Sequence, residues 1–299
     1  YYKGSPKLKK VFIRIMNGTN LVTELKSGNV QLAASGGIGS VPVKDLDVLK
    51  KDNKLIVKAV PSLNTQYLEV NNSNPAFNVK FRRAVTMAID RQKICDELYK
   101  GTAQIVPTVY TKVSPVYDES VKPLPYDPEA AKKELAESGF DTSKEITLQV
   151  PIGNVLREQS ADLIQQNLQA IGLNVKQQKL DFPTVLGNAK KGDYEMMLLG
   201  YGLTPDPDYS NYFVPGGSNN FCHADDPKLT EMMNNAASLP DAEARKAAYK
   251  EIQAYMRDNQ FVTSLYETDQ INVQSKNLVG GIKDFWEGSL DDLYQWHFE

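Results

Sequence analysis

The sequence has few of the residues from which metal centres and disulfide scaffolds are built. Its 299 residues include two cysteines and two histidines. These are too few for a disulfide framework, a thiolate zinc site or a multi-histidine metal centre. We therefore expect no metal and no cofactor. The core must depend on apolar packing, which the 41% of hydrophobic residues can supply.

The chain also lacks a large excess of charge and a long apolar run. Lys and Arg number 34 against 37 Asp and Glu, for a net charge of -3. This balance argues against a nucleic-acid partner, which requires a basic face. The longest nearly apolar run, Met196–Leu203, is too short to cross a bilayer. The sequence begins at Tyr1 without a targeting segment, so it does not indicate the compartment.

Motifs of common enzyme classes are absent too. The patterns GxSxG, HExxH, CxxC and GxxxxGK[ST] do not occur. Gly36–Ser40 is glycine-rich, but it lacks the spacing of a phosphate-binding loop. Cys222 and His223 stand close to Asp225 and Asp226, yet a soft thiolate beside hard carboxylates suits no single ion. We interpret all of these segments as loops.

The first half of the chain shows strand and helix patterns. Alternating apolar and polar residues predict strands at Val11–Met16, Leu55–Val60 and Gln66–Val70. Leu21–Lys26 is predicted to be a helix. Apolar spacing predicts one helix of about four to five turns over residues 81–98. The segment that follows, Pro107–Tyr126, is predicted to be an extended loop. A helix is then expected to begin after Asp127 and end at Gly139.

The second half alternates strands and helices in the manner of an α/β fold. Strands are predicted at residues 146–150, Leu173–Leu180 and Met196–Gly202, with a helix over residues 161–171. Met196–Gly202 is apolar without alternation, which is typical of a strand buried on both faces. It runs into a loop rich in Pro and Asp, and α/β sheets bind ligands at such places. Further predicted elements are helices at Pro227–Ser238 and Asp241–Asn259 and strands at Phe261–Leu265 and Ile271–Gln274.

One stretch carries a specific residue pattern. From Tyr67 to Arg91 a strand ends in Asn, and a loop follows with Pro-Ala-Phe-Asn, a basic pair, Ala and Ala-Ile-Asp-Arg. The residues in these places are Pro75, Phe77, Asn78, Arg82, Arg83, Ala84, Ala88, Ile89, Asp90 and Arg91. This pattern resembles extracellular solute-binding proteins of family 5, the oligopeptide- and dipeptide-binding receptors of ABC importers. Tyr126–Lys132 and Gly192–Asp208 are similar to two further family motifs, so the resemblance covers nearly the whole chain.

The resemblance implies an α/β, two-lobe, periplasmic-binding-protein-like fold of the large type II cluster. Residues 1–70 would belong to the first lobe, residues 71–268 to the second, and residues 269–299 would return to the first. Family members are longer than this chain, so we expect part of the first lobe to lie outside this sequence.

The same resemblance implies a function. The chain would be part of an ABC importer's substrate-binding protein, which captures peptides in the cleft between its lobes, delivers them to a membrane permease and performs no catalysis. It would be a monomer when full length, located outside the cytoplasm as a cell-surface lipoprotein or a periplasmic protein. A second possibility is the same receptor fold with a nickel chelate, an oligosaccharide or another small polar solute as its ligand. A third is a sensor or adhesion module. A fourth is a hydrolase that uses Asp206 and Asp208.

Site residues follow from the resemblance position by position. Glu69 matches an acidic residue on the hinge strand of oligopeptide binders, and Tyr201 matches a Trp that lines the cleft. Gly202 and Leu203 would provide cleft backbone. From the residues alone, Tyr201 could instead be a core residue without a binding role. Glu69 could likewise be an exposed acid on a strand.

The chain departs from the family at the position that grips the peptide ammonium. Peptide binders carry an Asp before the Pro-rich turn, and here Leu203 or Thr204 stands in its place. Leu198 and Leu199 occupy the strand where some oligopeptide binders have basic residues. Asp206 could replace the missing Asp, although in the family it more often shapes the turn. This departure favours the non-peptide alternative.

Overall fold

A mixed β-sheet dominates the computed structural model, which describes residues 4–16, 18–33, 41–283 and 290–299. Among these residues seven strands form the sheet, with β3 (Ala103–Gln104) paired to β7 beside the main order. That order is β1 (Leu32–Ala33), β7 (Thr263–Ser275), β2 (Leu55–Val70), β6 (Met196–Gly202), β4 (Glu145–Pro151) and β5 (Asn174–Leu180). A separate antiparallel pair joins β8 (Leu278–Val279) to β9 (His297–Phe298).

The chain forms two compact units. Unit 1 comprises Tyr1–Ser62 and Thr268–Glu299, and unit 2 comprises Leu63–Glu267. Both transitions fall within strands, since β2 and β7 each contribute residues to both units. The first transition therefore precedes the loop near residue 70 at which we expected the lobe boundary. The identity of these units with the family's lobes stays a prediction.

Unit 1 contains short elements. Its helices are α1 (Gly18–Ser27) and α2 (Leu46–Lys50), with β1 paired antiparallel to β7. The strand predicted at Val11–Met16 is wrong, because the structure shows no strand there. A strand requires a partner for its backbone groups, and no described strand pairs with this segment. The glycine-rich stretch Gly36–Ser40 lies outside the described residues.

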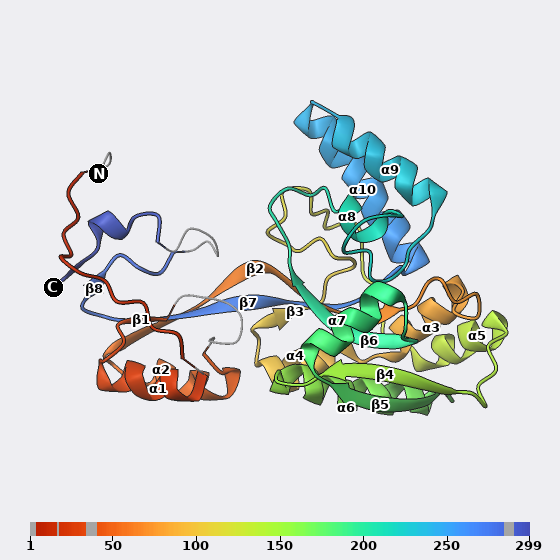
Figure 1. The fold of residues 1–299 in the computed structure, drawn as a ribbon, viewed down its shortest axis with the longest axis horizontal. Helices are drawn as coiled ribbons and strands as arrows, with labels where there is room; N and C mark the ends of the chain where they lie inside the picture. Colours follow the sequence, from red (N-terminus) through yellow and green to blue (C-terminus); the bar gives the residue numbers. More distant parts are fainter. Residues whose placement is uncertain (1–3, 17, 34–40, 284–289) are drawn as a thin grey trace. The chain divides into compact units, whose positions relative to one another are not determined.

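Unit 2 carries helices on both faces of its strands (Figure 1). α6 (Val155–Ala170) connects β4 to β5 and packs its buried face into the larger core cluster. α7 (Phe182–Lys191) connects β5 to β6 and packs against a second cluster on the opposite face. β4 pairs parallel with both β5 and β6, so the carboxyl termini of these three strands lie at the same end of the sheet.

The predicted single helix over residues 81–98 is two helices, α3 (Val79–Ala88) and α4 (Arg91–Tyr99). Between them Ile89 adopts an extended conformation. The Asp90 carboxylate accepts a hydrogen bond from the backbone of Lys93 and caps α4. An N-cap residue has non-helical backbone angles, so the helix is interrupted at Asp90. The apolar spacing continues across this interruption, and the sequence pattern therefore did not show it.

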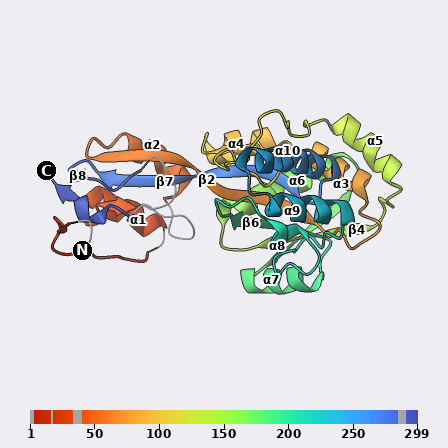
Figure 2. The same ribbon diagram turned by 90° about the horizontal axis from the view of Figure 1, so that it is seen from above.

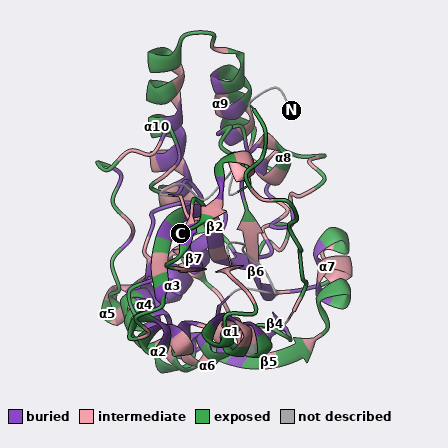
Figure 3. Cartoon of the chain, turned by 90° about the vertical axis from the view of Figure 1, so that its left-hand side faces the viewer, coloured by how far each residue is buried: buried purple, intermediate pink, exposed green. Residues whose placement is uncertain are grey.

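The other long helices lie close to their predicted positions. α5 (Pro128–Ser138) begins after the Asp127 cap and ends at Gly139 in the left-handed conformation, as the sequence predicted. α9 (Pro227–Ser238) and α10 (Ala242–Asn259) pack side by side (Figure 2). Their outer sides are largely exposed and their facing sides buried (Figure 3).

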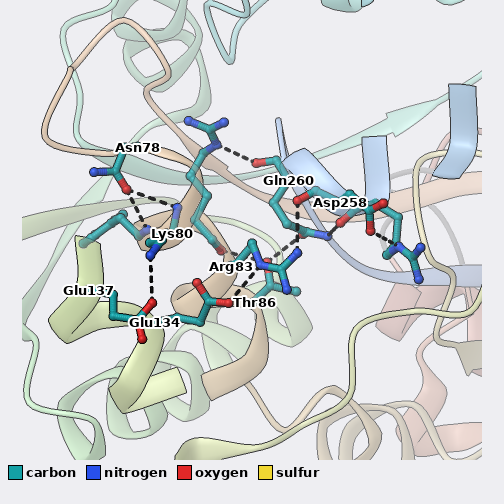
Figure 4. Close-up of polar contacts among 11 residues, drawn as sticks. Asn78, Lys80, Arg83, Thr86, Glu134, Glu137, Asp258 and Gln260 are labelled. Carbon is teal, nitrogen blue, oxygen red and sulfur yellow. Dashed lines mark hydrogen bonds and ion pairs between the residues drawn. The ribbon is translucent and has the colours of Figure 1, made fainter. Parts of the chain in front are cut away.

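Polar contacts join α3 to α5 (Figure 4). Lys80 pairs with Glu137 at 2.7 Å and Arg83 with Glu134 at 3.2 Å. The Asn78 side chain caps α3 and also donates to the carbonyl of Ser138. Arg83 of the family-like motif thus has a structural partner in this unit, and so has the nearby Lys80.

Candidate functional site

The last part of β6 has one open edge. β6 pairs with β2 along its whole length, from Val70 opposite Met196 to Asn64 opposite Gly202. On its other edge, register partners in β4 are described for Met196 and Met197 alone. In the same register Val150 and Pro151 lie beside Leu198 and Leu199, and β4 ends there. Among the described residues, the backbone groups of Gly200–Gly202 on this edge therefore have no strand beside them. An extended ligand can pair with such an edge.

The two faces of β2 and β6 are occupied differently. Leu68, Val70 and Leu198 point into the larger core beneath α6. Tyr67, Met197 and Leu199 point to the face covered by α7. Because side chains alternate along a strand, Glu69 and Tyr201 belong to this second face.

Tyr201 is half-buried in an aromatic cluster. Its ring centre lies 4.6 Å from that of Tyr67, 4.9 Å from Tyr212 and 6.0 Å from Phe221. Its hydroxyl is buried without a hydrogen-bond partner in the described part of the chain. Burial raises the pKa of this hydroxyl, so it stays protonated and able to donate. The ring is packed, as the core interpretation expected, and its buried hydroxyl has no described hydrogen-bond partner.

Glu69 is buried, with 2% of its surface exposed, so it is not the exposed strand acid considered above. Burial raises the pKa of its carboxyl to about 8. The Oε2 atom has no hydrogen-bond partner among the described residues. At neutral pH the carboxyl is therefore mostly protonated, and a nearby cation would ionise it.

The loop after β6 is held from several sides. The backbone N–H of Leu203 donates to the carbonyl of Leu63 over 3.0 Å, and the Leu203 side chain is buried. The side chain of Thr204 is exposed, and its carbonyl accepts a hydrogen bond from the Tyr209 hydroxyl over 2.9 Å. Gly202 is exposed and lies opposite Asn64. Thr204 thus presents an exposed side chain at the position where peptide binders carry Asp, and its hydroxyl donates to the carbonyl of Asp206 over 3.2 Å.

Asp206 has partners within the protein. Its Oδ1 accepts from the backbone of Asp208 over 3.0 Å and pairs with the Arg245 guanidinium over 2.9 Å. Both interactions shape the turn. An ammonium would have to compete with Arg245, so Asp206 is a poor replacement for the missing Asp.

The Pro- and Tyr-rich loop supports this turn. The ring of Tyr110 stacks on Tyr209 with centres 4.9 Å apart, and its hydroxyl donates to the carbonyl of Pro207. The ring of Tyr249, from α10, lies 5.7 Å from that of Tyr110. The segment expected to be an extended loop therefore serves as a buried aromatic support.

The structure separates the residues considered for a metal site. Cys222 is buried and His223 bonds through Nε2 to the carbonyl of Ala189 over 2.8 Å. Asp226 caps α9 by accepting from the backbone of Leu229. Among the described residues, no group of three His, Cys, Asp or Glu side chains could hold a metal ion.

A cavity of about 470 Å³ lies elsewhere in unit 2. Its wall includes Lys190, His223 and Asp225 together with the loop at residues 215–218. None of the predicted site residues lines it. Neither its shape nor its mixed lining favours one class of ligand.

Arg157 is a candidate residue that the sequence analysis did not single out. It lies in the first turn of α6, and its Nε donates to Oε1 of Gln66 over 3.0 Å. A positive charge at the N-terminus of a helix opposes the helix dipole. This unfavourable position of a basic residue was the only feature of the sequence that could have pointed to Arg157, because its partner Gln66 lies on a strand distant in sequence.

Comparison with known proteins decides the family. Residues 1–221 match the model of the bacterial extracellular solute-binding proteins, family 5, middle region. The chain belongs to this family. Di/tripeptide-binding protein 1 of Pseudomonas aeruginosa is 29% identical over 89% of this chain and 52% of its own length. Oligopeptide-binding protein AppA of Bacillus subtilis is 26% identical over 94% of this chain and 54% of its own length. The chain thus spans about half the length of these curated relatives.

Solved structures show the same fold. AppA of Bacillus subtilis in complex with a nonapeptide covers 95% of the chain with a TM-score of 0.80 and 24% identity, and 59% of that structure is covered. CtaP of Listeria monocytogenes covers all of the chain with a TM-score of 0.87 and 23% identity, over 62% of its own length. NikA of Staphylococcus aureus in complex with Ni(L-His)2 matches with a TM-score of 0.77 and 20% sequence identity. The match covers 95% of this chain and 60% of the NikA chain. The expected α/β periplasmic-binding-protein-like fold is confirmed.

The family consists of extracellular solute-binding proteins, which bind ligands. In the described part of this family member, no helix has the length and apolar character needed to span a membrane.

Proposed function

We propose that this chain is part of a substrate-binding protein that captures peptides and delivers them to the permease of an ABC importer. The open edge of β6 over Gly200–Gly202 carries the proposal. A peptide is an extended chain whose N–H and C=O groups need strand-like partners when they leave water. The names of the two curated relatives described above support a peptide as the ligand.

Aromatic and backbone groups at the end of β6 suit broad peptide recognition. Tyr201 would contact a ligand side chain with its ring edge and donate from its free hydroxyl. Gly202 leaves the backbone accessible, and Thr204 offers an exposed hydroxyl. Side chains of the ligand can then remain in hydrated pockets, which tolerate different sequences.

The peptide ammonium requires a partner other than the usual Asp. We assign this role to Glu69, because its carboxyl lies on the same sheet face as Tyr201 and its Oε2 lacks a partner. An ammonium beside it would lower the pKa from about 8 and ionise the carboxyl. Burying a charge is tolerated when it is paired in this way.

A non-peptide solute is the second candidate. Leu203 and Thr204 replace the Asp that grips an ammonium, and a ligand without an ammonium would not need it. A metal chelate or a sugar would use the same face of unit 2. We propose for either ligand that the protein acts outside the cytoplasm, as a periplasmic protein or an anchored lipoprotein, and as a monomer.

Native mass spectrometry of the purified protein, incubated with a mixture of short peptides, tests the proposal. We expect a ladder of added masses that dissociate into peptides on denaturation. A single non-peptide mass or a metal-sized increment would favour the second candidate. Protein that retains no peptide from the mixture would contradict the peptide proposal.

A further inference from the structure

Glu69 is a buried acid without a counter-charge. Its side chain is 2% exposed, its Oε2 atom has no hydrogen-bond partner among the described residues, and no described cation forms an ion pair with it. A carboxylate ionised in this place would lose the solvation of water and gain no opposite charge in return. The free protein therefore holds Glu69 as the neutral acid at neutral pH, in agreement with its raised pKa.

The titratable groups closest to Glu69 are neutral as well. Tyr194, directly before β6, and Cys222, in the loop before α9, both interact electrostatically with the Glu69 carboxyl. Burial raises the pKa of the Tyr194 phenol and of the Cys222 thiol, so neither group carries a charge at neutral pH. Arg82 on α3 acts on Cys222, but all of its described hydrogen bonds go to backbone carbonyls.

The other elements around Glu69 bring no described charge to it. α7 covers this face of the sheet with apolar side chains, and its charged residues, Lys190 and Lys191, are exposed. On β7, the neighbour of β2, Tyr266 packs into the larger core cluster. Glu267 on the same strand accepts a hydrogen bond from a backbone N–H of the Pro- and Tyr-rich loop. A cation beside Glu69 would therefore have to come from a ligand.

A row of polar groups leads from Glu69 to the open edge of β6. Thr65, Tyr67 and Glu69 alternate along β2 and so share one face of the sheet, and Tyr201 lies opposite Thr65 on β6. Each of these four side chains has a buried oxygen without a hydrogen-bond partner in the described part of the chain. Buried oxygens in this condition are places for a polar ligand group or an ordered water. The row ends at Tyr201, within the open segment Gly200–Gly202.

We propose that Glu69 gives up its proton when the ammonium of a peptide binds, so that the protein exchanges one proton for each peptide it captures. The O–H bond of the carboxyl breaks, the proton passes to the solvent, and the carboxylate pairs with the ammonium. This inference rests on the proposed peptide function and adds a pH dependence to it. A ligand without a positive charge would leave the carboxyl protonated and would release no proton.

The exchange fixes the direction in which affinity changes with pH. In the free protein the pKa of Glu69 is about 8, and an ammonium beside the carboxyl lowers it. Below about pH 8 a proton must leave on binding, so the affinity increases by up to about tenfold for each pH unit gained. Above about pH 8 the α-amino group of the peptide loses its own proton, and the affinity falls again. The tightest binding is expected near pH 8.

The test counts protons and peptides together. The protein is mixed with a library of tripeptides in a weakly buffered solution at pH 6.5, a pH indicator measures the protons released, and mass spectrometry counts the peptides retained. The wild-type protein should release about one proton for each retained peptide, and retention should increase about tenfold or more from pH 5.5 to 7.5. A library with acetylated N-termini should be retained less and should release no proton.

Glu69→Gln removes the exchangeable proton but keeps a neutral side chain. It should release no proton, and its retention of the library should vary by less than about twofold over the same pH range. A matched control is Glu134→Gln, an acid of the same unit that pairs with Arg83, and it should behave like the wild-type protein. Circular dichroism checks that all variants are folded.

The outcomes separate this inference from the proposed function. Peptides retained by the wild-type protein without release of a proton would overturn the exchange and leave the peptide function in place. Release that persists in Glu69→Gln would also overturn it, since the proton would come from another group. Retention of no peptide at any pH would overturn the function as well.

Discussion

Unit 2 covers its apolar side chains more completely than unit 1, although it is the larger of the two. Among the described residues, eight exposed large apolar side chains belong to unit 1 and five to unit 2. In unit 1 four of them follow closely in sequence, namely Val11, Phe12, Ile13 and Ile15. In unit 2 three gather at the carboxyl ends of β4 and β5. Exposed apolar surface therefore lies at different places in the two units: on a segment without a described partner strand in unit 1, and after the ends of two neighbouring strands in unit 2.

The strongest test of this comparison exchanges one phenylalanine in each unit for alanine. Phe81 is fully buried in the core of unit 2, and Phe12 is 81% exposed in unit 1. We expect Phe81→Ala to lower the free energy of unfolding by about 3–5 kcal/mol. Phe12→Ala should change it by less than about 0.5 kcal/mol. Urea unfolding followed by circular dichroism measures both. Equal losses would mean that the Val11–Ile15 segment is packed in solution.

A second test concerns a buried acid. The pKa of Glu69 is about 8 in the folded chain and near 4.5 when the group is in water. Between these values the folded state holds a proton that the unfolded state releases, so stability falls as pH rises through this window. The expected slope is on the order of 1 kcal/mol per pH unit.

Glu69→Gln keeps a neutral side chain and should flatten this dependence between pH 5 and 8. Glu24→Gln, at a partly exposed acid of unit 1 that pairs with Arg14, should leave it unchanged. Urea unfolding at four pH values compares the three proteins. A wild-type slope that survives in Glu69→Gln would assign the effect to another group.

The smallest effect is expected at the turn after β6. Arg245→Gln removes the ion pair with Asp206, whose side chain is 64% exposed. Exposed pairs contribute little, so the free energy of unfolding should fall by less than about 1 kcal/mol. Peptide binding should persist if Asp206 only shapes the turn. Binding that increases clearly would show that Asp206, once released, can hold the ammonium.

Local signals in the sequence predicted much of unit 2. Asp127 and Gly139 mark the ends of α5, and the limits of β6 and α9 were also predicted, because caps and apolar runs act within a few residues. The single helix predicted across Ile89 and Asp90 was wrong, since a capping break can leave the apolar period unchanged.

The site was harder to predict. The resemblance supplied Glu69 and Tyr201, but the burial of Glu69 depends on side chains from several distant segments. Arg157 became visible through its hydrogen bond to Gln66, which lies on another element. The strand pattern at Val11–Met16 failed for a related reason: a single segment can show alternation, but only a neighbouring strand can satisfy its backbone.

The order of the units along the chain has a consequence for synthesis. Unit 2 is one uninterrupted stretch from Leu63 to Glu267, whereas unit 1 is assembled from two stretches separated by all of unit 2. A ribosome therefore completes unit 2 while the last stretch of unit 1 has not yet been made. Domains generally fold as units during synthesis. The nascent unit 2 can fold early. β1, within the first 62 residues, can pair with β7 only after Val273 and Gln274 have been synthesised.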